Sequence, residues 1–333
     1  MVRIGKLRKT LVIVLIGIIL LFARTGYMLV RPGSAEDIAE FITVEEGGKN
    51  HDGSFYLVTV TQQNASPLLM LYGLLDPIVD LQPLRTVIPP GMDPEEHRLL
   101  LEQWMRESQN LARVIALRRF GIDVPIKSDG VEVVAVGEES PALGLLEPRD
   151  VIVAVDGQPV SLAEELVTKV QLRAVGEPVE LTVLRGKEAI TVTMPTTTHP
   201  EQQDKAAIRV AIQSLNWQPQ LPVKIEIQVG QITGPSAGLM FVLEILNQLE
   251  PADLTAGKQI AGTGTINLRE EVGSIGGVRQ KVRAAEKAGA QYFLVPEGNF
   301  AEAKMVARSI ELVPVATLEE ALAFLEGIGS AKR

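Results

Sequence analysis

The spacing of hydrophobic and polar positions changes along this chain and divides it into regions. Valine and isoleucine alternate with polar residues over 223–229, which predicts a half-buried strand. Asn299 with Glu302, and Thr317 with Glu320, have the spacing of capping boxes and support two helices near the end of the chain. After the first strand the pattern predicts alternating elements: helix 235–249, strand 259–266, helix 277–288, strand 291–295, helix 300–308, strand 311–315 and helix 318–326.

The region before residue 200 has shorter and mostly β-type segments. Ser54–Val60 is the clearest run in a strand-rich stretch over 40–75. Asp93 followed by Pro94 predicts the start of a helix that runs to about Arg119, because Asp is a favoured N-cap and Pro a favoured first helical residue. Residues 195–200 are interpreted as a linker. Between that helix and the linker lie four predicted strands and one helix: Val131–Val136, Val151–Val155, the helix Leu162–Leu172, Val179–Leu184 and Ala189–Met194.

An apolar run near the amino terminus follows four basic residues. It covers residues 11–23 and resumes over 27–30. One helix over 11–30 would be about 30 Å long, which is the thickness of a bilayer's hydrocarbon core. We expect an uncleaved transmembrane anchor, with a cleaved signal peptide as the alternative because the uninterrupted run has 13 residues. With either interpretation the basic flank stays in the cytoplasm and the rest of the chain is exported.

Charge and composition exclude several classes of function. Residues 1–31 carry six basic and no acidic residues, which leaves 26 basic and 41 acidic residues in the remainder, a net charge of −15. An acidic body without a basic stripe argues against nucleic-acid binding. Cysteine is absent, the three histidines form no HExxH pattern, and no GxxxxGK[ST] occurs. A thiol nucleophile, structural disulfides, cysteine-ligated zinc, a zincin site and a P-loop ATPase are therefore excluded, and we expect neither metal nor cofactor.

Ser236 is the candidate nucleophile. It lies in Gly234-Pro-Ser-Ala-Gly238, between the predicted strand and an apolar helix, and Pro235 suits the first turn of that helix. The backbone N–H groups of Ser236 and Ala237 would then be available to stabilise an oxyanion. The letters also fit the G-x-S-x-G elbow of α/β-hydrolases, but that fold needs a downstream histidine and all three histidines precede Ser236. A plain strand-to-helix turn with Ser as the cap is the alternative.

Lys281 is the candidate base. On the predicted helix 277–288, Val278, Val282, Ala285 and Ala288 share one face, and Lys281 is the one charged residue on that side. Burial disfavours the ammonium form and lowers the pKa of a lysine, and a neutral amine accepts the proton of a serine hydroxyl. A lysine at the rim of the core, with its amine in water, is the alternative.

Three stretches together resemble the proteolytic domain of Lon-type Ser/Lys peptidases, in their order and in the spacing from Ser236 to Lys281. The resemblance implies that Ser236 is the nucleophile, that Lys281 is the general base, and that Thr263 hydrogen-bonds the lysine. Thr233 and Thr265 stand where ATP-dependent members often have acidic residues, and no ATPase module is present. The matching stretches are Gly234–Gly238, Ala261-Gly-Thr-Gly264 and Ile275-Gly-Gly-Val-Arg-Gln-Lys281.

The middle of the chain resembles a PDZ domain, through Glu139-Ser-Pro-Ala142, the stretch Leu146–Gly157 and the helix that follows. PDZ domains bind a peptide as an added strand and hold its terminal carboxylate with backbone N–H groups. Phe120-Gly121-Ile122 resembles the carboxylate-binding loop, and Arg149 replaces the usual glycine of the Gly-Asp turn. A β-domain that only packs or spaces is the alternative.

The whole layout resembles the membrane-anchored, PDZ-containing Lon-like proteases of bacteria. The resemblance implies an α+β fold: a Lon-type proteolytic domain of mixed α/β structure, an inserted β-rich PDZ domain and an N-terminal transmembrane helix. We expect a basic flank and anchor over 1–31, the N-terminal part of the peptidase over 32–119, the PDZ domain over 120–196 and the catalytic part over 197–330. The expected location is the cell membrane, with a single span, the N-terminus in the cytoplasm and the catalytic body outside it.

The predicted function is that of an ATP-independent serine endopeptidase that processes exported or cell-surface peptides and proteins, with the PDZ domain binding substrate ends. The expected partners are these substrates and the membrane, without nucleic acid or ATP, and a homo-oligomer is left open. Two alternatives remain. One is a membrane-tethered PDZ adaptor with a catalytically silent peptidase domain, and the other is a serine hydrolase that uses an upstream histidine such as His51.

Overall fold

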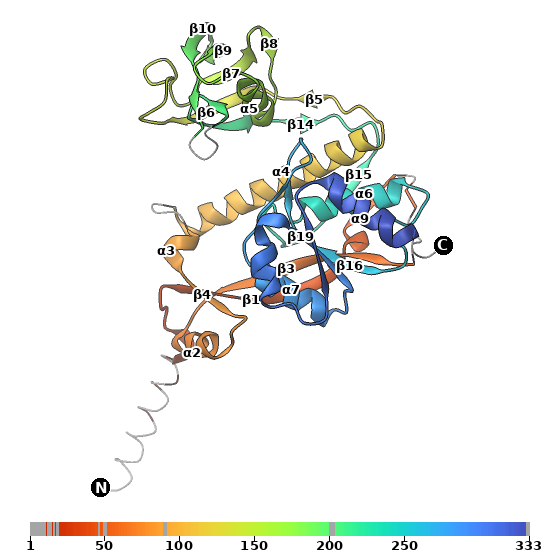
Figure 1. Cartoon of the computed structure of the whole chain (residues 1–333). Coiled ribbons are helices and arrows are strands. Elements are labelled where there is room, and N and C mark those ends of the chain that lie inside the picture. Colours follow the sequence, from red (N-terminus) through yellow and green to blue (C-terminus); the bar gives the residue numbers. More distant parts are fainter. Residues whose placement is uncertain are drawn as a thin grey trace, which may run out of the picture. The chain divides into compact units, whose positions relative to one another are not determined.

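The computed structural model describes residues 11, 15, 17, 20–45, 47–48, 52–88, 92–199 and 204–330. The chain divides into two compact units (Figure 1). The first is formed by residues 1–122 together with 223–333, and the second by residues 123–222. The second unit therefore interrupts the sequence of the first.

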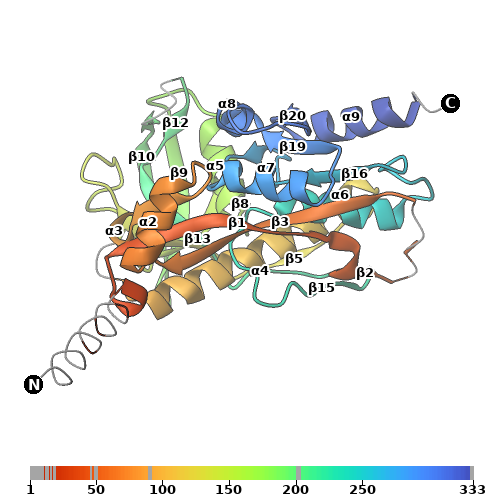
Figure 2. The same ribbon diagram turned by 90° about the horizontal axis from the view of Figure 1, so that it is seen from below.

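A mixed sheet forms the centre of the first unit, with strand order β20-β19-β16-β3-β1-β4. The pairs from β20 to β3 are parallel, whereas β1 is antiparallel to both β3 and β4. Figure 2 shows β1 and β3 running side by side. Strands β3 and β16 are neighbours although they come from distant parts of the sequence. The bounds are Tyr27–Asp37 (β1), Ser54–Asn64 (β3), Asp80–Pro83 (β4), Gln259–Gly262 (β16), Tyr292–Pro296 (β19) and Glu311–Val315 (β20).

Helices α6 (Gly238–Leu249) and α7 (Val278–Lys287) cover opposite faces of this sheet. Successive side chains of a strand point to opposite faces. In β16, Ala261 belongs to the core cluster of α7, whereas a Cβ placed on Gly262 would lie 2.5 Å from the sulfur of Met240 in α6. The long helix α4 (Pro94–Arg119) packs against α6. The smaller elements of this unit are η1 (Ile38–Glu40), β2 (Ile42–Val44), α2 (Pro67–Leu75), α3 (Leu84–Val87), β15 (Ile225–Ile227), β17 (Thr265–Ile266), β18 (Val272–Gly273), η2 (Glu297–Asn299), α8 (Phe300–Lys304) and α9 (Leu318–Ser330).

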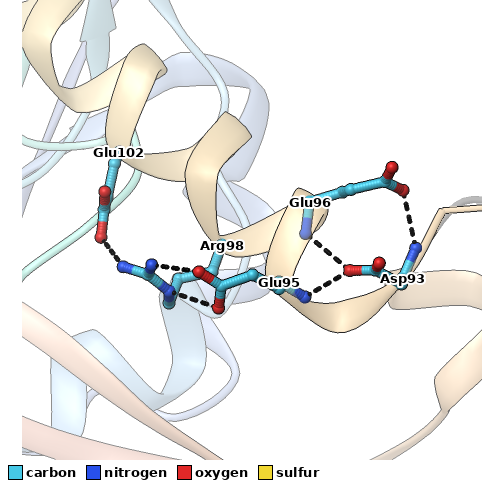
Figure 3. Close-up of polar contacts among 5 residues, drawn as sticks. All are labelled: Asp93, Glu95, Glu96, Arg98 and Glu102. Carbon is cyan, nitrogen blue, oxygen red and sulfur yellow. Dashed lines mark hydrogen bonds and ion pairs between the residues drawn. The ribbon is translucent and has the colours of Figure 1, made fainter.

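Helix α4 begins where the sequence predicts. The Asp93 carboxylate accepts hydrogen bonds from the N–H groups of Glu95 and Glu96, each 2.8 Å long, and the Glu96 carboxylate accepts one of 3.0 Å from the Asp93 N–H (Figure 3). Asp93 is therefore the N-cap, as predicted, and together with Glu96 it forms a capping box. Arg98 pairs with Glu95 and Glu102 on the exposed side of the same turns. The helix ends at Arg119, as expected.

The two capping boxes near the end of the chain differ from each other. Thr317 Oγ1 accepts the Glu320 N–H at 3.3 Å, while the Glu320 carboxylate accepts the N–H of Ala316 instead of that of Thr317. The box at Asn299 is wrong, because that side chain bonds both the N–H and the carbonyl of Ile275, at 2.8 and 3.1 Å. The Asn299 amide therefore makes a tertiary contact with Ile275 and does not form the helix cap that the local sequence pattern predicted.

The second unit is built on a sheet with strand order β10-β9-β7-β6-β13, and β8 pairs with β7. Helix α5 (Ala163–Gln171) supplies Leu166 and Val170 to its buried core. Strand β13 follows the predicted linker over 195–200 and pairs with β6, so the unit extends beyond that segment. The bounds are Ile126–Lys127 (β5), Gly130–Val136 (β6), Val151–Val155 (β7), Gln158–Pro159 (β8), Pro178–Arg185 (β9), Glu188–Pro195 (β10), Thr197–Thr198 (β11), Ala206–Ala207 (β12), Val210–Leu215 (β13) and Gln218–Pro219 (β14).

The expected helix over 11–30 is corrected at its end. Residues 27–30 open strand β1, and Leu29 and Val30 are buried there. They are extended because β1 finds partner strands on both sides, so tertiary pairing decides the conformation of an apolar segment. None of the helices within the described ranges has both the length and the apolar character that crossing a membrane requires. Residues 1–10 of the predicted basic flank, and residues 12–14, 16 and 18–19 of the predicted anchor, lie outside the described residues.

Candidate active site

The loop that carries Ser236 is held from helix α4. The Gly234 N–H donates to the carbonyl of Leu101 at 3.1 Å, and the hydroxyl of Ser108 donates to the carbonyl of Pro235 at the same distance. Gly234 has a φ of +87°, a conformation that favours glycine. Helix α6 begins at Gly238 with Ala237 as its N-cap. The prediction that Pro235 occupies the first turn of this helix is therefore wrong, and Ser236 precedes the helix by two residues.

The segment after β16 holds the same loop from the other side. The carbonyl of Ser236 accepts hydrogen bonds from the Gly264 N–H at 2.8 Å and from the Thr263 hydroxyl at 2.9 Å. The Thr263 N–H donates to the carbonyl of Leu294 in β19, at 3.1 Å. Thr263 is thus fixed at the carboxyl end of two parallel strands. This edge of the sheet is where the structure brings two of the predicted stretches together.

Lys281 reaches this edge from helix α7. The helix is preceded by Gly277 at a φ of +71°, where a side chain would also meet Val60. Lys281 is 3% exposed, and its Nζ lies 2.7 Å from Ser236 Oγ and 2.8 Å from Thr263 Oγ1. The structure therefore brings together the predicted nucleophile, base and supporting residue, which come from three separate segments.

Burial lowers the pKa of Lys281 to about 7, because the ammonium form loses its hydration in the core. A large share of the amine is then neutral at neutral pH, and its lone pair is available for a proton. At hydrogen-bond distance from Ser236 Oγ, such an amine meets both the geometric and the acid–base requirement of a general base.

The helical-wheel prediction for α7 needs two corrections. Gln280, expected on the polar side, is fully buried and donates to the carbonyl of Ile78 and the carboxylate of Asp80, at 2.7 and 2.8 Å. Glu286 is also mostly shielded, since its carboxylate accepts backbone N–H groups from residues 308–310. Lys281 is therefore not the one charge that faces inward, but it is the charge directed at Ser236.

The backbone N–H groups of Ser236 and Ala237 were expected to hold an oxyanion. Neither donates a hydrogen bond to another described residue. Ala237 is the N-cap of a helix of 12 residues, whose aligned peptide dipoles place partial positive charge at this end. The arrangement is suited to binding a negatively charged oxygen beside Ser236. No group of three or more His, Asp or Glu side chains within the described ranges is arranged to hold a metal ion.

A cavity of about 800 Å³ lies along α4 and the segment that leads to Ser236. Ile227 and Val229 supply apolar side chains, and Thr233 lines the cavity as well. The charged and polar side chains come from α4, namely Arg98, Glu102, Arg106 and Gln109. The lining of this cavity therefore combines apolar with charged and polar side chains, and its last residue is Thr233, three positions before Ser236.

The second unit has a cavity of its own, of about 660 Å³. Leu166 and Val170 of α5 form one wall, and residues 206–212, which include β12 and the first three residues of β13, form the other. Glu139, His199 and Arg209 are also part of its lining. A groove between one helix and one strand has the shape that an added peptide strand needs.

The prediction for the carboxylate-binding loop is corrected. Phe120, Gly121 and Ile122 form the C-terminal cap of α4 and belong to the first unit, and they are not among the residues that line this cavity. The local letters resemble the loop, but the long helix α4 incorporates them in its end. Arg149, by contrast, adopts the expected glycine-like backbone with a φ of +75° and stays outside the cavity.

Some residues that build the site were missed from the sequence. Ser108 and Leu101 hold the Gly-Pro-Ser turn, yet they lie in a helix without any motif, so no sequence signal pointed to them. Glu244 in α6 is buried, and its carboxylate accepts a hydrogen bond from Gln248 at 2.7 Å. Burial raises the pKa of Glu244 to about 7. Glu244 is the one charged residue of the helix Gly238–Leu249, and this is a signal that the sequence contains. His51 lies outside the described residues.

Comparison with family models supports both parts of this picture. Residues 119–196 match the PDZ domain model, and residues 180–325 match the model of the Lon protease (S16) C-terminal proteolytic domain. The second match contains Ser236, Thr263 and Lys281. The chain thus combines PDZ-like and Lon-protease-like regions, and the second supports a serine peptidase.

The chain is also similar in sequence to curated Lon proteases. The chain is 34% identical to a Lon protease of Azospirillum brasilense over 27% of its own length and 11% of that protein, and 25% identical to a Lon protease of Neorickettsia sennetsu over 69% and 30%. An archaeal Lon protease of Methanocaldococcus jannaschii is 33% identical over 33% and 18%. The chain therefore spans less than a third of the length of these relatives. Among solved structures, the PDZ domain of an SdrC-like protein from Listeria monocytogenes matches 27% of this chain and 93% of its own, with 22% identity and a TM-score of 0.25.

Proposed function

We propose that this chain is a membrane-tethered, ATP-independent serine endopeptidase in which Ser236 and Lys281 form the catalytic dyad. The observation that carries the proposal is the 2.7 Å approach of a buried lysine amine to the Ser236 hydroxyl. A buried lysine has no structural advantage over an apolar residue, because removing its charge from water is unfavourable. A role in chemistry accounts for its position.

The geometry supports the following sequence of steps. Lys281 Nζ takes the proton of Ser236 Oγ as that oxygen bonds to the carbonyl carbon of the scissile peptide. The N–H groups of Ser236 and Ala237 stabilise the resulting oxyanion. The lysine then returns its proton to the leaving amine as the C–N bond breaks. Water attacks the acyl-serine with the same lysine as base, which releases the second product and restores the hydroxyl.

Thr263 acts as the positioning residue for the amine. Its hydroxyl donates to the Ser236 carbonyl, so its oxygen has a lone pair directed at Lys281 Nζ. This arrangement keeps the amine facing the serine while the proton moves. The cavity beside α4 holds the substrate chain on its way to Ser236.

The second unit binds substrate ends in the groove between α5 and β13. The substrates are exported or cell-surface peptides and proteins, and the residues before β1 tether the enzyme to the membrane with the catalytic body outside the cytoplasm. Cleavage needs no ATP, because substrates of this kind reach the site as extended chains. The sequence has no P-loop that would bind ATP.

The test uses the full chain in detergent or vesicles and an unstructured polypeptide substrate, with and without ATP. The variants are Ser236→Ala and Lys281→Met, and Arg283→Met is the matched control on the same helix. We expect cleavage by the wild type and the control at equal rates in both nucleotide conditions, and none by the two dyad variants. A serine-reactive phosphonate should label the wild type and Arg283→Met, and it should not label Ser236→Ala or Lys281→Met.

Three results would contradict the proposal in different ways. Cleavage that survives Ser236→Ala refutes the nucleophile. Dependence on ATP refutes the unassisted mechanism. Peptide binding by the second unit without any phosphonate labelling from pH 6 to 9 would favour the adaptor with a silent peptidase domain.

A further inference from the structure

Helix α2 carries apolar side chains on the side that faces away from the protein. Its nine residues, Pro67–Leu75, contain no charged residue, and none of them is buried. Leu69 and Met70 face the protein and pack on Leu29 and Val79. The outward stripe has i, i+3, i+4, i+7 spacing and side chains between 44% and 76% exposed: Leu68, Leu71, Tyr72 and Leu75. A contiguous exposed apolar stripe of this kind marks an interaction surface.

Helix α2 contacts β1, the first strand of the unit (Figure 1). The Thr25 hydroxyl donates to the carbonyl of Ala65 at 2.5 Å, and the Ala65 N–H donates to the carbonyl of Tyr27 at 2.8 Å. Residues 20–22 before this junction are also exposed and apolar. The start of α2 is therefore attached to the point where the 11–23 run ends.

Basic side chains occur at the same junction. Arg24 and Arg31 are exposed on either side of the start of β1. Arg85 is exposed on α3, and the N–H of the preceding Leu84 donates to the carbonyl of Gly26 at 2.9 Å. Basic groups beside an apolar surface are suited to anionic lipid headgroups above acyl chains.

We infer that α2 lies in the interface of an anionic lipid bilayer, with the stripe of Leu68, Leu71, Tyr72 and Leu75 in the acyl region. The inference rests on the proposed membrane tether. A helix of nine residues is too short to span a bilayer, so it lies along the surface. The tether and α2 then form two attachments at one end of the sheet, which limits the orientations of the first unit relative to the membrane.

The chain has no cysteine, so a single introduced thiol can be labelled selectively. Leu75→Cys probes the stripe, and Met305→Cys is the matched control, since these side chains are 76% and 73% exposed in the same unit. Each full-length variant is labelled with an environment-sensitive fluorophore and reconstituted in phosphatidylcholine–phosphatidylglycerol vesicles with or without nitroxide-labelled lipid. We expect a blue shift and quenching at position 75 and neither at 305, with weaker quenching in pure phosphatidylcholine.

The outcomes distinguish the inference from the tether. If the chain floats with vesicles while position 75 behaves like position 305, the inference for α2 is wrong and the tether stands. If the chain does not associate with vesicles, both are wrong. A blue shift at position 75 that appears without lipid and grows with protein concentration would identify a second copy as the occupant and overturn the lipid assignment. Equal quenching in pure phosphatidylcholine would overturn the role of the basic residues.

Discussion

Reactivity of Ser236 should follow the ionisation of Lys281, and the structure gives the expected size of the effect. Burial lowers the pKa of this lysine to about 7. At pH 7.5 roughly three quarters of the amine is then neutral, whereas an ordinary lysine with a pKa of about 10.4 would be neutral in about one molecule in a thousand. The fold therefore increases the fraction of neutral lysine amine at pH 7.5 by a factor of about 600.

The sign follows from the role of the amine. A general base must be unprotonated, so reactivity is lost as the pH falls through 7 and reaches a plateau above about pH 8. Below the pKa the rate should fall tenfold for each pH unit, because the neutral fraction does. The assay is the second-order rate constant for labelling by a serine-reactive phosphonate between pH 5.5 and 9. This reagent reports on the serine directly and avoids ionisation of a peptide substrate.

Glu244 requires a control, because burial raises the pKa of its carboxyl to about 7 as well. The control variant is Glu244→Gln, which keeps the size and polar character of the side chain that contacts Gln248. The inflection near pH 7 should persist in Glu244→Gln. A rate that keeps rising tenfold per pH unit up to pH 9, or an inflection that vanishes in Glu244→Gln, would refute the assignment of the base to Lys281.

Three further predictions follow from individual contacts. Thr263→Val removes a hydroxyl at 2.8 Å from the lysine amine and should lower kcat about 10- to 100-fold with little change in KM, measured by peptide cleavage, whereas unchanged kcat would contradict its positioning role. Ser108→Ala removes the hydrogen bond to the Pro235 carbonyl and should lower the phosphonate labelling rate about fivefold while thermal unfolding changes little; equal rates would show that α4 does not hold the turn. Glu244→Gln should stabilise the fold at pH 8 by about 1–3 kcal/mol and have almost no effect below pH 4, measured by urea unfolding, because a carboxyl whose pKa is raised to about 7 loses stabilising free energy as the pH rises from about 4.5 to 7; the opposite pH trend would count against it.

Local chemistry determined much of what could be predicted from the sequence. The cap at Asp93 formed as expected because it involves only residues three positions apart. The inward direction of Lys281 followed from helical periodicity alone. Strands β19 and β20 followed from short apolar runs between turns. In each case the pattern that allowed the prediction lies within a few consecutive residues.

Tertiary contacts decided the remaining features. Tyr27–Val30 is a strand because β3 and β4 pair with it, although its letters continue an apolar helical run. Phe120–Ile122 form the turn that caps α4, and the Asn299 side chain bonds the backbone of Ile275 instead of capping a helix. Hydrogen bonding and burial between distant segments outweigh local preferences of a few tenths of a kcal/mol to about 1 kcal/mol.

The site itself illustrates this division. The motifs around Ser236, Thr263 and Lys281 were visible in the sequence, but the 2.7 Å distance between the hydroxyl and the amine exists only because two parallel strands end at the same edge of the sheet. Ser108 has no motif and is found at the turn only once α4 packs on α6. Sequence determined which groups can react, while the tertiary fold decided which of them meet and how dry their surroundings are, because proximity and burial depend on residues far apart in the chain.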